Sequence, residues 1–590
     1  MKKIIISLSI MISVLTYTYA NNQTLELIEL SNWKFSIGDN LGWASPEYND
    51  SAWKPIKVGS TWQQQGYESA DGYAWYRIKF SLPSSLKNSA FIKDVLLFAL
   101  GNIEERDQTF LNGKFLGQNA NSFAVNVEPL HDLSKLEIPY NATRNYTIQV
   151  NDPRLIWDKE NVLAIRVYTS RLAGGLSSSP INVRMKDLKD YLVFDLDSRG
   201  LHSKPGGMLT KTVILKNLSP LLEIKGKLTI ELTNAENKKV IAVQTCNIDL
   251  KGEDLPVTFN VKGDILVPMD IKYTFIESKS NYKVEYTREP DGAGGWVKYE
   301  NNPILGGHLG TIFDVQVQKK DEGGFQMNCS WRTERSIAVS QSEDGLKWSK
   351  PEIILTYDQN SNWEQDISRP FIIKKDGIYH MWYTGQVWRG WDKGNSYIGY
   401  ASSKDGKKWT RYSGNPIIKP EFPWEDDGVI LPQVIWDEQD KLFKMWYSAG
   451  DQFEPDAVGY ATSKDGLHWD KYKGNPIFKG DPHTQWEQAK VALAQVIKRE
   501  NDYLMFYIGY LDPHYAQIGM ARSKDGITNW VRYKGNPIIR HGKGWDSEAT
   551  YKASVVPDSA NNRWLLYYNG RQGDHEQMGM AIHKGMDLGF

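Results

Sequence analysis

The chain has 590 residues, too many for one hydrophobic core, and its length predicts about three domains. With 70 basic and 71 acidic side chains the formal charge is -1, which argues against a nucleic-acid partner or an anionic membrane surface. Aromatic residues make up 12% of the chain, including 22 Trp and 31 Tyr. Such a content is typical of β-rich proteins, and it also suits proteins that stack aromatic rings on sugars.

Residues 1–20 have the pattern of a secretory signal peptide. Two lysines precede an apolar stretch from Ile4 to Leu15, and small residues end the segment at Ala20. No later apolar run reaches the roughly 18 residues that a membrane-spanning helix needs. We therefore expect an exported protein, periplasmic or secreted, with no membrane insertion and no nucleic-acid partner.

Residues 21–185 combine short strands with turns that are rich in tryptophan. A strand is predicted at 95–100, and a hairpin tip at 111–114. This pattern predicts a jelly-roll β-sandwich.

Residues 186–290 alternate apolar and polar side chains in the segments 211–215, 227–232 and 257–261, without motif residues. We expect a small immunoglobulin-like sandwich that serves as a spacer. The glycine-rich run 291–295 then predicts a hinge.

Residues 296–590 contain an internal repeat of about 60 residues. A Ser-X-Asp-Gly turn recurs four times and is followed each time by a tryptophan. Gly-Asn-Pro-Ile and Trp-Glu or Trp-Asp markers keep the same phase, with aromatic, alternating strands between them. The turn aspartates are Asp344, Asp405, Asp465 and Asp525, spaced by 61, 60 and 60 residues. The repeat predicts a five-bladed β-propeller, so the whole chain is expected to be all-β.

The first domain resembles the galactose-binding-like jelly roll of family 2 glycosidases and sialate O-acetylesterases. The resemblance covers nearly all of residues 30–185. It rests on Gly42-Trp43, Trp75-Tyr76-Arg77, Leu111-Asn112-Gly113 and the run from Asn161 to Tyr168. In those relatives the module often packs on the catalytic domain without binding sugar itself.

The propeller resembles the five-bladed glycosidases of families 43, 32 and 117, which release xylose, arabinofuranose, fructose or anhydrogalactose units from polysaccharide ends. The resemblance implies a carboxylate base in blade one, an assisting Asp in blade two and a carboxylic acid in blade three. This chain departs from the pattern, because Arg369 stands before the blade-two proline where families 43 and 32 have an acid. The blade-three glutamate is replaced by Ile430 or Leu431, so the identity of the acid stays open.

Residues that recur in every blade are expected to hold the blades together, whereas a site on the ring axis must use residues that break the repeat. The recurring carboxyl groups are therefore interpreted as structural: the four turn aspartates and Glu364, Glu425, Glu487 and Asp546. Asp314 breaks the repeat at the entry to its inner strand and matches the position of the family's base. We predict that Asp314 is the general base; the alternative is a salt bridge to Arg332 or Arg335.

Cleavage of a glycosidic bond needs a second carboxyl group that donates a proton. By blade order, Asp366 is predicted to orient the base and Asp427, or else Glu425, to be the proton donor. Glu548 is the substitute if Asp427 points to solvent.

Cations near the funnel mouth are predicted to bind substrate, including an anionic sugar that carries a uronate or sulfate group. The alternative is that they pair with the acids named above. The blade-two insertion adds Trp388 and Trp391, which could stack on a sugar ring. No Asp-rich ligand loop is present, so neither a metal nor another cofactor is expected. The predicted substrate-binding residues are Arg332, Arg369, Trp388, Lys490, Lys552 and Arg571.

The sequence therefore predicts an exo-acting glycoside hydrolase with an oligosaccharide or polysaccharide of plant or algal origin as its substrate. A β-xylosidase or α-L-arabinofuranosidase activity is the most frequent in the families it resembles. The alternative is a carbohydrate-binding propeller that has lost its catalytic acid.

Overall fold

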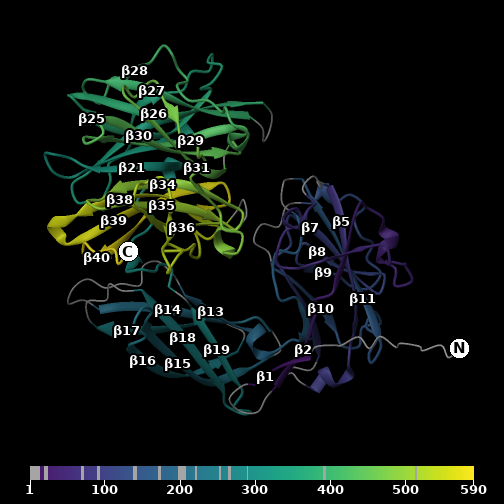
Figure 1. The fold of residues 1–590 in the computed structure, drawn as a ribbon. Coiled ribbons are helices and arrows are strands. Elements are labelled where there is room, and N and C mark those ends of the chain that lie inside the picture. Colours follow the sequence, from purple (N-terminus) through teal and green to yellow (C-terminus); the bar gives the residue numbers. More distant parts are fainter. Residues whose placement is uncertain are drawn as a thin grey trace.

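The computed structural model is nearly all β-structure (Figure 1). It describes residues 14–18, 24–67, 72–88, 94–136, 143–170, 174–196, 208–219, 222–251, 254–262, 268–288, 290–389, 394–452, 454–511 and 515–590. Helices in this part of the chain are short 3₁₀ turns at Leu41–Ala44, Gln63–Gln65, Ser84–Asn88, Leu133–Lys135, Leu188–Asp190, Gly307–Leu309, Arg332–Glu334, Pro423–Glu425, Gln485–Glu487 and Ser559–Asn561. None of them is long and apolar enough to cross a membrane. Most of the predicted signal peptide lies outside the described residues, so it stays a prediction.

The first domain is a β-sandwich of two sheets, as the sequence predicts. One sheet has the order β1-β2-β12-β6-β10 and the other the order β4-β3-β5-β11-β7-β8-β9. The strands are β1 (Val14–Thr18), β2 (Thr24–Glu29), β3 (Trp33–Ile37), β4 (Lys54–Ile56), β5 (Gly72–Ser81), β6 (Val95–Gly101), β7 (Arg106–Leu111), β8 (Lys114–Gln118), β9 (Asn121–Ser122), β10 (Arg144–Gln149), β11 (Glu160–Thr169) and β12 (Asn182–Met185). Alternating side chains of both sheets fill one apolar core between them.

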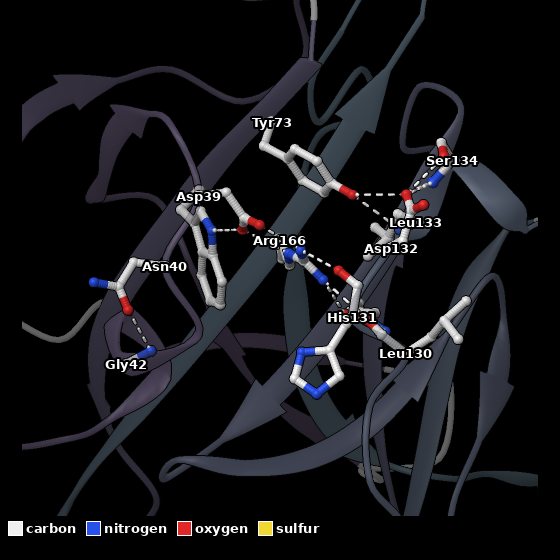
Figure 2. A network of polar contacts seen from close by, with 12 residues as sticks. Asp39, Asn40, Gly42, Tyr73, Leu130, His131, Asp132, Leu133, Ser134 and Arg166 are labelled. Carbon is white, nitrogen blue, oxygen red and sulfur yellow. Dashed lines mark hydrogen bonds and ion pairs between the residues drawn. The ribbon is translucent and has the colours of Figure 1, made fainter.

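A polar network on the outer face of this sandwich is centred on Arg166 of β11 (Figure 2). The Arg166 guanidinium donates to Asp39 Oδ1 at 2.7 Å, to Gln108 Oε1 at 2.9 Å and to the His131 carbonyl oxygen at 2.7 Å. Tyr73 lies over the guanidinium, with 4.4 Å from Arg166 Cζ to the ring centroid. Because Arg166 is only 1% exposed and its donors are used within the domain, this cluster fixes the surrounding loops.

The second domain is a smaller sandwich with sheet orders β13-β14-β17 and β16-β15-β18-β19, which matches the predicted immunoglobulin-like fold. Its strands are β13 (Leu192–Leu196), β14 (Met208–Asn217), β15 (Ile224–Asn234), β16 (Val240–Leu250), β17 (Leu255–Lys262), β18 (Met269–Glu277) and β19 (Lys283–Arg288). The segment 291–295, predicted as a hinge, is held by backbone contacts instead: Ala293 donates to the Ile538 carbonyl oxygen at 2.9 Å. It is fixed because the strand that closes the propeller begins directly after it.

The third domain is the predicted five-bladed propeller. Blade 1 contains β21 (Ile312–Lys319), β22 (Phe325–Trp331), β23 (Ser336–Ser342) and β24 (Glu352–Thr356). Blade 2 contains β25 (Asp366–Lys375), β26 (Ile378–Trp388), β27 (Gly394–Ser403) and β28 (Thr410–Arg411). Blade 3 contains β29 (Gly428–Asp437), β30 (Leu442–Gly450), β31 (Pro455–Ser463), β32 (Asp470–Lys471) and β33 (Phe478–Lys479). Blade 4 contains β34 (Lys490–Lys498), β35 (Tyr503–Tyr510), β36 (Ala516–Ser523) and β37 (Val531–Arg532). Blade 5 contains β38 (Ala549–Asp558), β39 (Arg563–Gln572), β40 (His575–Lys584) and β20 (Trp296–Lys298).

The ring closes by pairing of its two sequence ends. Strand β20, which precedes blade 1 in the sequence, pairs antiparallel with β40 of blade 5. Lys298 Nζ of β20 lies 2.6 Å from Asp546 Oδ2, and the two side chains are 6% and 4% exposed. This pairing covers the edge that a linear array of blades would leave open.

Glutamines of the inner strands connect neighbouring blades. The Gln316 side chain bonds both the carbonyl and the amide of Ile372 in the next blade, at 2.8 and 2.7 Å. Gln433 makes the same pair of bonds to Val496, and Gln495 bonds Val555. These bonds satisfy buried backbone groups and hold the inner strands in fixed relative positions.

The carboxyl groups that recur in the repeat make local structural contacts. Asp405 accepts bonds from the Lys407 and Lys408 amides at its turn, both at 2.8 Å. Glu425 is fully buried and accepts a bond from the Tyr447 hydroxyl at 2.8 Å, while Lys471 Nζ lies 2.8 Å from its other oxygen.

Candidate functional site

Four inner strands have the same backbone irregularity, at a position where the residue type differs between blades. Asp314, Arg369, Leu431 and Lys552 have left-handed backbones with φ of 52°, 56°, 56° and 50°. The pairing register of the four strands shifts at these residues. A β-bulge re-aims its side chain, so these positions direct different side chains toward the ring axis in different blades.

Three of these residues form a buried charged cluster. Arg369 Nε lies 3.1 Å from Asp314 Oδ2, and Lys552 Nζ donates to the Ala494 carbonyl oxygen at 2.9 Å. Asp314, Arg369 and Lys552 are 3%, 8% and 6% exposed. Burial raises the pKa of Asp314, an effect that Arg369 and Lys552 oppose. Burial lowers the pKa of Lys552 to about 8, against the attraction of Asp314.

A cavity of about 210 Å³ lies in front of this cluster. All five blades contribute to its wall, which places it on the ring axis. Its lining residues are Phe313, Arg332, Arg369, Glu454, Tyr510, Ala516, Ala549, Tyr551, Arg571 and Glu576.

Two of the lining residues are carboxylic acids that the sequence analysis missed. Tyr551 donates a short hydrogen bond to Glu576, and Arg571 Nη1 lies 3.7 Å from Glu454 Oε1. Both acids lie at or just before the start of the third strands of their blades, whereas the residues that interrupt the repeat lie in the inner strands and the segments before them. Alignment of the repeated glycines at 399, 459, 519 and 579 places Ser396, Asp456, Ala516 and Glu576 at one position, where only blades 3 and 5 have acids among these four blades.

None of the four predicted catalytic carboxyl groups is among the residues that line the cavity. Asp314 is behind the wall and pairs with Arg369, and not with Arg332 or Arg335, which were the alternative partners expected from the sequence. Burial also raises the pKa of Asp366, and Arg332, Arg335 and Arg369 oppose this shift. The charges of Arg332 and Arg369 thus act on both Asp314 and Asp366.

Glu548 and Asp427 differ in their surroundings. Glu548 accepts a bond from the Gly573 amide at 3.0 Å and lies 3.8 Å from Arg571 Nε, which places it beside the cavity. Asp427 is exposed, and its backbone carbonyl oxygen accepts a bond from the Ser396 amide at 3.1 Å. Asp427 therefore faces solvent. For this case the sequence predicts Glu548 as the proton donor in place of Asp427.

The predicted substrate-binding residues separate into two groups. Arg332, Arg369 and Arg571 line the cavity, and Lys552 lies behind it. Lys490 instead pairs with Asp451 and with Asp456, the latter at 3.1 Å, and burial of its ammonium group opposes the rise in pKa that these acids cause. Trp388 is 41% exposed at the end of β26, and Trp391 lies outside the described residues.

Comparison with known protein families gives two matches. The model of the glycosyl hydrolases family 32 N-terminal domain matches residues 325–493 within the propeller. The model of the beta-galactosidase second all-beta domain matches residues 38–167 within the first sandwich.

Curated relatives are similar to part of the chain. A 1,2-beta-oligomannan phosphorylase of Thermoanaerobacter sp. (strain X514) is 26% identical over 260 residues, which cover 43% of this chain and 80% of the relative. A beta-1,2-mannobiose phosphorylase of the same organism is 25% identical over 27% of this chain and 53% of its own length. A beta-galactosidase of Bacteroides ovatus is 26% identical over 23% of this chain and 14% of its own length.

Solved structures with some similarity include a glycoside hydrolase at 21% identity and a TM-score of 0.41, covering 48% of this chain and 89% of that one. A thermostable family-43 glycoside hydrolase is 20% identical with a TM-score of 0.38, over 47% of this chain and 91% of that one. One family match lies within the propeller and the other within the first sandwich. The five-bladed propeller is therefore similar in part to glycosyl hydrolases, the first sandwich is similar to a beta-galactosidase domain, and part of the chain is similar to carbohydrate-active phosphorylases.

Proposed function

We propose that the axial cavity binds the terminal sugar of an oligosaccharide or polysaccharide and that the protein hydrolyses the bond that holds this unit. The proposal rests on one observation: two carboxylic acids, Glu454 and Glu576, line the same cavity. Hydrolysis of a glycosidic bond uses such a pair, in which one group donates a proton and the other activates water or attacks directly. The cavity volume of about 210 Å³ is below the roughly 300–1,000 Å³ of most ligand pockets, which favours one terminal unit and hence exo action.

The surrounding side chains support distinct tasks for this pair. The bond from the Tyr551 hydroxyl holds one oxygen of Glu576 and leaves the other for a water molecule or the sugar. Arg571 Nη1 lies 3.7 Å from Glu454 Oε1 and attracts that carboxyl group. Tyr510 and Tyr551 provide wall surface on which a sugar ring can pack.

The identity of the terminal sugar is also proposed. The families that the propeller resembles favour a β-xyloside or an α-L-arabinofuranoside of plant or algal polysaccharide. The names of the two phosphorylases add β-1,2-linked mannosides to the substrates that should be assayed. Because residues 1–20 have the sequence pattern of a signal peptide, we propose that the reaction takes place in the periplasm or outside the cell.

The test is a set of aryl glycosides and oligosaccharides of these sugars, assayed with the wild-type protein and with Glu454→Gln and Glu576→Gln. Loss of either carboxyl group is expected to lower the rate about 10²–10⁴-fold. The variant of the proton donor should recover on leaving groups that need no protonation, whereas the variant of the other acid should not. Binding of sugars without cleavage of any of them would favour the carbohydrate-binding alternative.

Asp314→Asn belongs in the same assay because Asp314 is the predicted general base. If Asp314 activates water, the variant loses rate on every leaving group. If it holds Arg369 in place, as their 3.1 Å contact suggests, the variant raises KM more than it lowers kcat.

Phosphorolysis is a second candidate, because three arginines line the cavity and part of the chain is similar to two phosphorylases. Inorganic phosphate would then replace water as the acceptor. Assays with and without phosphate separate the two reactions, since hydrolysis releases free sugar and phosphorolysis releases a sugar 1-phosphate.

A further inference from the structure

We infer that the terminal sugar in the cavity carries a carboxylate, so that the substrate is a uronoside, and that Arg332 recognises this group. The inference rests on the proposed function, because it specifies the substrate class of the same cavity. It starts from the different surroundings of the three lining arginines.

Arg369 and Arg571 are next to acids of the protein. Arg369 Nε lies 3.1 Å from Asp314, and Arg571 lies 3.7 Å from Glu454 and 3.8 Å from Glu548. Their charges are therefore largely matched within the protein.

Arg332 is different. It is exposed in the turn Arg332–Glu334, and its guanidinium lies 4.5 Å from the centroid of the Phe313 ring. Among the residues that the structure describes, the Arg332 guanidinium forms no hydrogen bond and no ion pair within 4 Å. Asp314 and Asp366 are close enough for its charge to act on them, but neither forms an ion pair with it. An aromatic ring thus holds a planar set of donors at the cavity wall.

The surroundings of the Arg332 guanidinium favour a ligand with a single negative charge. Arg369 and Arg571 have acids of the protein within 4 Å, whereas Arg332 has none among the described residues. A carboxylate supplies one negative charge and accepts two parallel bonds from a guanidinium. A phosphate dianion would bring a second negative charge next to Glu454 and Glu576, and a neutral sugar would leave Arg332 unmatched.

Binding to the full-length protein tests the inference without requiring catalysis. The probes are glucuronate, galacturonate and mannuronate, each compared with its neutral parent sugar and with inorganic phosphate, in calorimetric titrations at low salt. At least one uronate is expected to bind about tenfold or more tightly than its neutral parent. Arg332→Gln should abolish this preference, and Arg332→Lys should keep only part of it.

Arg335→Gln is the matched control, because Arg335 follows in the same loop but stacks on Tyr357 outside the cavity lining. This variant should keep the preference for the uronate. Equal binding of neutral sugars, binding of phosphate alone, or an unchanged preference in Arg332→Gln would overturn the inference.

The two proposals fail in different ways. If neutral glycosides are cleaved while no uronate binds, the inference is wrong and the proposed function stands. If a uronate binds through Arg332 but no glycosidic bond is cleaved in any substrate, the inference stands and the proposed function is wrong.

Discussion

At the scale of single residues, the propeller axis is unusual for the ionisable groups that it buries side by side. Lys552 is 6% exposed, and its ammonium group reaches the Ala494 carbonyl oxygen at 2.9 Å, next to the Asp314 and Arg369 pair. A buried cation of this kind costs folding free energy unless its charge is compensated. The lowered pKa of Lys552, about 8, shows that burial outweighs the attraction of Asp314.

This pKa predicts how stability changes with pH. Lys552 has a pKa of about 8 in the folded chain against 10.5 for an unperturbed lysine. Between these values the unfolded chain binds more protons, so stability rises with pH over this window and the cost of the buried charge is complete below pH 8. The wild-type protein should therefore gain up to about 3 kcal/mol relative to Lys552→Met between pH 8 and 10.5. Melting curves of both proteins over this range measure the difference, and parallel pH dependences would contradict the shift.

The sequence could identify part of this site for a physical reason. Asp314, Arg369 and Lys552 interrupt a repeat in the inner strands, and the structure places these three side chains together. Glu454 precedes the third strand of blade 3, and Glu576 lies at the start of the third strand of blade 5. The cavity that they share is formed by residues of all five blades, and this long-range contact is not recorded in the pattern of a single blade.

At the scale of elements, closure of the ring depends on the strand β20. Trp296 is fully buried, and Lys298 forms a buried ion pair with Asp546, whose Oδ2 also accepts a bond from the Tyr568 hydroxyl at 3.2 Å. Both partners are held by hydrogen bonds in a place that water does not reach. Removal of one partner leaves the other charge buried.

Lys298→Met is therefore expected to destabilise the propeller by about 3–5 kcal/mol, because Asp546 loses its counter-charge. Lys441→Met is the control, since Lys441 and Glu438 form an ion pair while 70% and 75% exposed, and its loss should cost about 0–1 kcal/mol. Chemical denaturation of both variants gives the comparison. Equal effects would mean that the closing ion pair has no special weight.

At the scale of the whole molecule, the second sandwich is connected to the propeller by a segment that packs on the propeller. Residues 291–295 dock on blade 4, and Lys543 of the propeller lies 3.6 Å from Asp195 of the second sandwich. Residues 291–590 therefore contain every strand of the closed ring.

A shortened chain that starts at Asp291 is expected to fold as a closed ring, whereas one that starts at Asn301 lacks β20 and exposes the edge of β40. The second chain should melt at a lower temperature and aggregate. Thermal unfolding and size-exclusion chromatography of both chains check this expectation. Equal behaviour would show that β20 is dispensable.

The overall fold was predictable because the repeat, its turns and its alternating strands all agree with one architecture. The exception was the glycine-rich segment 291–295, whose composition is typical of a flexible linker. Its fixed position comes from a pairing between residues almost 300 positions apart, since β20 must reach β40.

The bulge that recurs in the inner strands also has an evolutionary consequence. Leu431 has the same left-handed backbone as Asp314, Arg369 and Lys552, with its amide bonded to Thr384 Oγ1 at 3.2 Å. The blade, and not the side chain, determines the backbone conformation at this position. A descendant of this protein could therefore acquire a new polar group at the axis by one substitution at Leu431 and change its substrate without remodelling the ring.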